Sequence, residues 1–144
     1  WRNYLEGSRY QLEDGSYLGA GWQRIEASWY LLDDQGYRLT GWQERNGQMY
    51  YLDGSGAMIT GWLSWNGRWC YMNETQDAYY GCLVRGHWLG KDGKTYYLDN
   101  IGYMVEGWNQ VDGNWYYFYP GQGNKAVNTT IDTFYVNDQG VWVH

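Results

Sequence analysis

Tryptophan recurs at a fixed interval in this chain, and that interval constrains the fold more than any other feature. Trp22, Trp42 and Trp62 follow one another every 20 residues, and the same distance separates Trp88 from Trp108. A period of about 20 residues is typical of a repeat array, in which each unit is one supersecondary motif that buries its apolar face against its neighbours. The sequence therefore predicts a stack of short repeats.

A hairpin turn is encoded at the same place in four of the repeats. With each repeat tryptophan counted as position zero, positions +4 and +5 read Asn46-Gly47, Asn66-Gly67, Asp92-Gly93 and Asp112-Gly113. Such pairs between apolar runs favour the type I′ turn of a β-hairpin, which needs positive φ at both central residues. The repeat that begins at Trp22 has Glu26-Ala27 instead, so we expect a different turn there. The predicted fold is all-β, a β-hairpin solenoid.

The strand after each turn has two distinct faces. Positions +8 and +10 are almost uniformly aromatic or apolar, from Tyr30 and Leu32 in one repeat to Tyr116 and Phe118 in another. Because alternate residues of a strand point to one face, we expect +8 and +10 to form the interior. Positions +7 and +9 then lie on the opposite face, where a ligand could reach them.

The whole chain, residues 1–144, is predicted to be a single repeat module. Its repeats start near Trp1, Trp22, Trp42, Trp62, Trp88 and Trp108, and residues 134–144 form a terminal partial repeat. The register breaks after Trp62, where Cys82 stands at the next tryptophan position, and we interpret residues 82–87 as an insertion. A longer stretch, 119–133, precedes the terminal repeat.

Composition agrees with a folded β-rich chain and argues against several functions. Leu, Ile, Val and Phe are scarce, but 11 Trp and 17 Tyr supply large apolar side chains. The net charge of −6 argues against nucleic acid binding, and no apolar run approaches the roughly 20 residues of a membrane span. The chain begins without an initiator Met or a signal peptide, so we expect other domains outside this sequence.

Catalytic and metal chemistry find little support in the sequence. His87 and His144 are the only imidazole ligands, so we predict no metal site. No activating constellation surrounds a nucleophile, so we expect a protein that is not an enzyme and uses no cofactor. The recurrent Asp33, Asp53 and Asp99 stand in turns, where aspartate hydrogen-bonds its own backbone.

The sequence resembles the choline-binding, or cell-wall-binding, repeat family, whose units read roughly GWxxxxGxWYYLxxxGxMxTGW. The matching residues include Gly41-Trp42, the strand 49–52, and the segment Gly56-Ala57-Met58-Ile59-Thr60-Gly61. The resemblance covers nearly the whole chain in five repeats. It implies a β-hairpin solenoid with ligand sites between successive hairpins.

The resemblance also implies which rings form each site: two tryptophans of one repeat, at 0 and +7, and the +9 tyrosine of the next. Two sets are complete in this sequence, Trp22 with Trp29 and Tyr51, and Trp108 with Trp115 and Tyr135. A third set is Trp62, Trp69 and Tyr97, with the insertion between its members. Two incomplete sets are Trp42 with Tyr71, where Met49 stands at +7, and Trp88 with Tyr117, where Thr95 does.

The two cysteines, Cys70 and Cys82, are separated by twelve residues and allow two interpretations. A disulfide would close a short loop and pin the insertion, which would stabilise the fold by roughly 3 kcal/mol. Two separate buried thiols would fit the sequence equally well.

We carry three hypotheses for function. The first is a non-catalytic module that anchors an extracellular or bacterial cell-surface protein through choline on teichoic acid or a related envelope polymer. The second is a carbohydrate-binding module, since residues 34–42 also resemble the glucan-binding repeats of streptococcal glucosyltransferases and the repeats of clostridial toxins. The third is a structural spacer or adhesin stalk with no small-molecule ligand.

Overall fold

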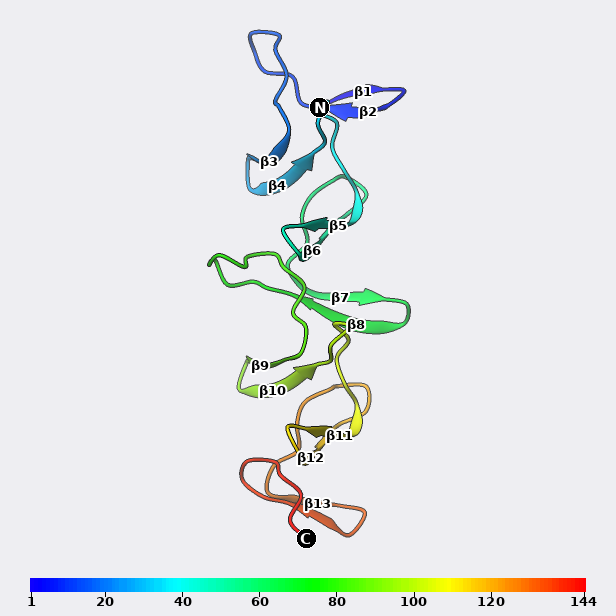
Figure 1. The fold of residues 1–144 in the computed structure, drawn as a ribbon, viewed down its shortest axis with the longest axis vertical. Helices are drawn as coiled ribbons and strands as arrows, with labels where there is room; N and C mark the ends of the chain where they lie inside the picture. The colour runs from blue at the N-terminus through cyan, green and yellow to red at the C-terminus, as the bar shows by residue number, and fades with distance from the viewer. The chain divides into compact units, whose positions relative to one another are not determined.

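The computed structural model describes all residues, 1–144, and consists of β-hairpins (Figure 1). The strands are β1 (Arg2–Tyr4), β2 (Gly7–Arg9), β3 (Gly21–Ile25), β4 (Ser28–Leu32), β5 (Gly41–Arg45), β6 (Gln48–Leu52), β7 (Gly61–Trp65), β8 (Arg68–Met72), β9 (His87–Lys91), β10 (Lys94–Leu98), β11 (Gly107–Val111), β12 (Asn114–Phe118), β13 (Thr129–Ile131) and β14 (Phe134–Val136). They form seven two-stranded sheets, each made of strands consecutive in the chain. The predicted fold class, an all-β β-hairpin solenoid, is confirmed.

The chain divides into two compact units. Unit 1 comprises Trp1–Leu63 and Met72–Leu83, and unit 2 comprises Ser64–Tyr71 and Val84–His144. The hairpin β7–β8 therefore contributes residues to both. That the repeats act as one module stays a prediction. The structure contains no helix with the length and hydropathy that a membrane crossing requires.

The hairpin turns follow the sequence prediction. Asn46 and Gly47 have φ values of 53° and 78°, and the other Asn-Gly and Asp-Gly pairs adopt the same left-handed conformation. In the turn of the Trp22 repeat, Glu26 has a φ of 58° but Ala27 does not have a positive φ, so that turn differs as expected. The last hairpin turns at Asp132-Thr133, where a β-branched residue has a φ of 78°.

The +10 residues supply most of the fully buried side chains. They are at most 1% exposed, and each is the last residue of a strand: Leu32, Leu52, Met72, Leu98, Phe118 and Val136. Burial of one such side chain contributes about 1.5–3 kcal/mol. The expectation that position +10 is interior is confirmed.

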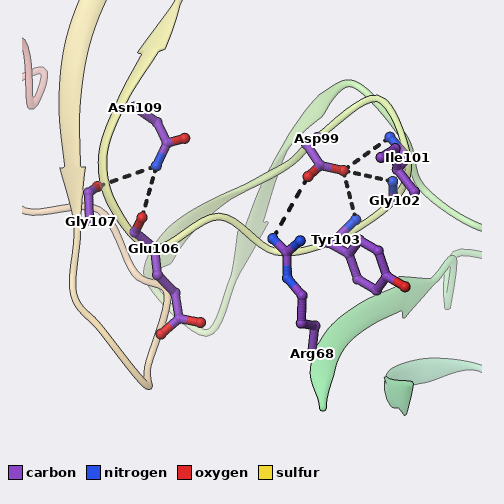
Figure 2. A network of polar contacts seen from close by, with 8 residues as sticks. All are labelled: Arg68, Asp99, Ile101, Gly102, Tyr103, Glu106, Gly107 and Asn109. Atoms are coloured by element: carbon purple, nitrogen blue, oxygen red, sulfur yellow. Dashed lines mark hydrogen bonds and ion pairs between the residues drawn. The ribbon is translucent and has the colours of Figure 1, made fainter. Parts of the chain in front are cut away.

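Carboxylates shape the turns that follow the hairpins. Oδ1 of Asp99 accepts hydrogen bonds from the backbone N–H groups of Ile101 and Tyr103, at 3.0 and 2.9 Å (Figure 2). Its other oxygen lies 3.8 Å from Arg68. Asp33 and Asp53 accept the same pair of N–H bonds in their own turns. These aspartates therefore stabilise local backbone, as the sequence indicated.

The extra residues after β8 lie mainly before Cys82, which corrects the predicted insertion at 82–87. In a standard turn, Asp53 N–H donates to the carbonyl of Ala57, whereas Asn73 N–H donates to the carbonyl of Cys82. The second connection is longer by five residues, all within 74–81. Leu83 then pairs with Met72 as Met58 pairs with Leu52, and a sixth extra residue lies between Leu83 and Trp88.

The disulfide alternative for Cys70 and Cys82 is wrong in this structure, where both are buried free thiols. Sγ of Cys82 lies 3.2 Å from Oη of Tyr50 and donates to it. Burial raises the pKa of the Cys70 thiol, and the negative charge of Asp99 raises it further. The structure therefore agrees with two separate buried thiols.

Candidate functional site

The pairing of the strands determines which ring each +9 tyrosine contacts. Trp42 lies directly opposite Tyr51 in the hairpin β5–β6, and their ring centroids are 5.1 Å apart. The same contact joins Trp88 to Tyr97 at 5.1 Å and Trp108 to Tyr117 at 5.2 Å. Each of these tyrosines thus packs on the tryptophan of its own hairpin. The prediction that +9 closes the site of the preceding repeat is wrong for them.

The ring that approaches from the next hairpin is at +8. Tyr50 packs edge-on against Trp22 with centroids 4.9 Å apart, and Tyr116 packs against Trp88 in the same way. Position +8 was expected to be interior, yet Tyr50 is only half-buried. The reason lies in the stacking, because a hairpin between two neighbours presents one face to each of them. Positions 0, +7 and +9 of one hairpin face the next hairpin. Positions +8 and +10 of that next hairpin point back toward them.

One backbone hydrogen bond repeats at every such junction between hairpins. The donor is the N–H at position +16 in the regular repeats, and the acceptor is the carbonyl at +7 of the repeat before it. Longer turns move the equivalent donor to Leu83 and Lys125, and we call this place +16 in every repeat. The donor–acceptor pairs, at 2.8 Å except for the fifth at 2.7 Å, are Arg38–Ser8, Met58–Trp29, Leu83–Met49, Met104–Trp69, Lys125–Thr95 and Trp142–Trp115. The bond places the +16 side chain beside the +7 side chain, so these two positions decide what lines each junction.

The Trp22 cleft is a cavity of about 240 Å³ in unit 1. Trp22 comes from β3 and Trp29 from β4, and the structure brings them together as predicted. Tyr50 of β6 replaces the expected Tyr51, and Met58 and Tyr80 complete the lining. Tyr80 belongs to the extra residues 74–81, so the long turn adds a ring to this cleft.

Tyr50 stays uncharged over the ordinary pH range. Burial, and then the contact of its hydroxyl with the Cys82 thiol, raises the pKa of Tyr50 to about 12. No acidic or basic side chain lines the Trp22 cleft. Its walls are therefore neutral rings and one thioether.

The Trp108 cleft is a second cavity, of about 220 Å³, in unit 2. Trp108 and Trp115 line it as predicted, together with Phe134 and Trp142. Phe134 stands where Tyr50 stands in the first cleft, and its ring centroid lies 6.1 Å from that of Trp108. The predicted Tyr135 is not part of the lining, and its hydroxyl hydrogen-bonds Asn128 instead.

The remaining predicted residues have separate surroundings. Trp69 is 44% exposed, and its carbonyl accepts the N–H of Met104, whereas Tyr97 packs on Trp88. Tyr71 is buried, and the ammonium of Lys91 lies 5.7 Å from its ring centroid. The assignment of Trp62 and Trp42 to ligand sites stays a prediction.

Sequence reasoning missed five lining residues: Tyr50, Met58, Tyr80, Phe134 and Trp142. The methionine was visible, since it belongs to the repeat pattern quoted for residues 56–61. Tyr50 was expected to be interior, but it is half-buried and contacts Trp22 of the preceding hairpin. Tyr80 lies outside the repeat register, so no periodic signal could have identified it. No group of three His, Cys, Asp or Glu side chains is arranged to hold a metal ion.

Comparison with known proteins adds independent findings. Residues 20–61, 39–81 and 84–129 match the model of a family described as choline-binding repeat. Choline binding protein F from Streptococcus pneumoniae is 36% identical, with a TM-score of 0.86 over 100% of this chain and 47% of that chain. CbpJ from Streptococcus pneumoniae TIGR4 is 37% identical, with a TM-score of 0.87 over 99% and 47%.

A third solved structure is the Cpl-1 endolysin complexed with a peptidoglycan analogue. It is 32% identical, with a TM-score of 0.56 over 88% of this chain and 36% of that chain. The chain spans less than half of the length of each of these three structures. No match was found among curated proteins.

Proposed function

The chain belongs to the choline-binding repeat family, and we propose that its Trp22 and Trp108 clefts hold the choline groups of a bacterial cell-envelope polymer. Through them the module would anchor a larger extracellular protein to the cell surface. In this role the chain binds and does not catalyse. The family model and the similarity to CbpF and CbpJ support a choline-binding module.

The observation that carries the proposal is the lining of the two clefts. Each combines two tryptophans of one hairpin with a ring from the next, and neither contains a charged side chain. A quaternary ammonium group cannot donate a conventional hydrogen bond, so it gains most from the electron-rich faces of aromatic rings. Tryptophan is the best of these, at about 0.5–1 kcal/mol when exposed and about 2 when desolvated.

The expected strength of one site suits a polymeric ligand. Three rings contribute about 3–5 kcal/mol before the cost of association, so a single site should bind choline no more tightly than the millimolar range. Several such clefts on one chain raise the overall affinity for a repetitive polymer by avidity, because the second contact forms at high effective concentration. The Cpl-1 structure with a peptidoglycan analogue supports an envelope partner.

Carbohydrate binding is the main rival, because tryptophan faces also stack on sugar rings. A sugar, however, presents several hydroxyl groups that need hydrogen-bond partners when they are desolvated. The Trp108 cleft is lined by Trp108, Trp115, Phe134 and Trp142, whose only polar groups are indole N–H donors. This lining favours a cation over a sugar.

The test is a titration of intrinsic tryptophan fluorescence with choline and, separately, with dextran or a maltooligosaccharide. We expect a saturable response to choline alone, and retention on a quaternary-amine resin with elution by free choline. Trp22→Ala should weaken the choline response of unit 1. A response to the glycan alone would favour the rival, and silence to both ligands would leave a structural spacer.

A further inference from the structure

The residues at +7 and +16 vary together across the hairpin junctions. Where +7 is tryptophan, the facing +16 residue is uncharged: Met58 faces Trp29, and Trp142 faces Trp115. Where +7 is a small polar residue, the facing +16 residue is a cation. Arg38 faces Ser8 and Lys125 faces Thr95. A small +7 side chain leaves space that a long +16 side chain can fill.

The Trp88 junction shows where the lysine goes. The ring centroids of Trp88 and Tyr116 are 4.9 Å apart, the same distance as between Trp22 and Tyr50 in the Trp22 cleft. Nζ of Lys125 lies 5.1 Å from the Trp88 ring centroid and 5.5 Å from that of Tyr116. Both distances are within the about 6 Å at which a cation is attracted to a ring face.

The lysine side chain is held in this place from both ends. Its ammonium donates a hydrogen bond to the carbonyl of Gln139 at 2.8 Å. Its stem runs past Gly140, where an added methyl group would lie 2.8 Å from Cδ of Lys125. Burial lowers the pKa of the Lys125 ammonium, which agrees with its withdrawal from water.

The Trp1 junction in unit 1 has the same construction. Trp1 packs against Tyr30 with centroids again 4.9 Å apart, and Cζ of Arg38 lies 4.8 Å from the Trp1 ring centroid. An added methyl group at Gly56 would lie 3.0 Å from Cδ of Arg38, so the arginine stem passes Gly56 as the lysine stem passes Gly140. Two junctions in different parts of the chain thus each place a cation of their own over the tryptophan of an equivalent ring pair.

We propose that Lys125 and Arg38 are built-in ligands, each occupying the aromatic corner of its junction and closing that junction to external cations. The identity of the external cation rests on the proposed function, but the closure does not. A cation tethered to the chain loses no translational and rotational entropy of association. It therefore competes with external cations at a high effective concentration. The +16 residue therefore sets which junctions of the array are open, and the open ones are those with tryptophan at +7.

The experiment follows the indole N–H resonances in ¹H–¹⁵N NMR spectra during titration with tetramethylammonium. Assignment of Trp88 uses Trp88→Phe. In the wild-type protein we expect the Trp88 resonance to stay in place while the Trp22 resonance shifts. In Lys125→Met, which introduces the residue type found at position 58, the Trp88 resonance should shift saturably. Thr95→Trp combined with Lys125→Met should strengthen that response.

Two matched variants control for charge and for fold. Lys125→Arg keeps a cation at +16 and should keep the junction closed. Lys94→Met removes an exposed lysine from the hairpin β9–β10, which carries Trp88, and should give no Trp88 response. A saturable Trp88 shift in the wild-type protein would overturn the proposal without any variant. So would a folded Lys125→Met protein with an unresponsive Trp88.

The outcomes also separate this proposal from the proposed function. If Trp22 and Trp108 respond in every variant but Trp88 responds in none, the closure is wrong and the choline assignment stands. If Trp88 responds only in Lys125→Met while Trp22 and Trp108 stay silent throughout, the closure stands and the choline assignment fails.

Discussion

The Trp22 junction and the Trp88 junction have the same backbone and different contents. In each junction the ring centroids of the tryptophan and of the +8 tyrosine of the next repeat are 4.9 Å apart. In each, the N–H at +16 donates a hydrogen bond to the carbonyl at +7. One contains Trp29 and Met58 around a cavity, and the other contains Thr95 and the ammonium of Lys125. The comparison teaches that hairpin stacking makes the corner, while two side chains decide whether it is open.

The largest expected effect tests whether the two regions share the same scaffold. Leu52→Ala should cost about 2–5 kcal/mol and Phe118→Ala about 3–5 kcal/mol of unfolding free energy, because both residues are fully buried at +10. Urea denaturation followed by tryptophan fluorescence measures both. A near-neutral change at either position would break the comparison, since the scaffolds would then differ in strength.

The next effect compares position +7 in the two junctions. Trp29→Ala removes one wall of the Trp22 cleft and should weaken choline binding there by about 2 kcal/mol, roughly 30-fold. Thr95→Ala is the matched control and should leave the choline affinity of the protein unchanged. Isothermal titration calorimetry checks both. Equal losses in the two variants would mean that the open and filled junctions do not differ in binding.

A smaller effect concerns the hairpin that supplies Phe134 to the second open cleft. Thr133 has a φ of 78°, a conformation that costs a β-branched residue about 1–2 kcal/mol. Thr133→Gly should therefore stabilise the protein by about 1 kcal/mol, after the entropy that glycine adds to the unfolded chain. Thermal unfolding measures the change. The reverse change Gly113→Thr, in the turn of β11–β12, should destabilise.

The last effect is a dependence of unfolding free energy on pH, which appears only in alkali. Because burial and the Cys82 contact raise the pKa of Tyr50 from 10.0 to about 12, the folded state holds this proton more tightly than the unfolded state. The associated stability is complete below about pH 10 and is lost as the pH rises towards 12. Unfolding free energies measured across that range should fall less steeply in Tyr50→Phe, and an identical slope would contradict the assignment.

Much of the scaffold could be predicted because it depends on local chemistry. Asn-Gly and Asp-Gly pairs determine the turns, and Leu52 and its equivalents recur at +10 in every repeat, which identifies them as core residues. The long turn at 74–81 was misplaced, because Cys82 occupies a tryptophan position by count but not by hydrogen bonding.

The lining of the site was harder to predict than its tryptophans. Trp22 with Trp29, and Trp108 with Trp115, were expected because the family resemblance implies a pair of tryptophans on one hairpin. The third ring depends on which face of the next hairpin turns toward them, and strand alternation leaves both faces equivalent. Tyr80 comes from a turn without repeat symmetry. Arg38 and Lys125 make the same backbone hydrogen bond, although their counts from the repeat tryptophan differ by one, and only their distances to the rings reveal what they do.

The short hairpin β13–β14 has no tryptophan of its own, yet it supplies Phe134, and the tail behind it supplies Trp142, to a cleft whose other walls lie on β11 and β12. Such a cleft is formed by two neighbouring hairpins together and not by a single repeat. The valency of the array therefore counts neighbouring pairs, and truncation after residue 128 would erase a pocket while leaving both of its leading indoles in the chain.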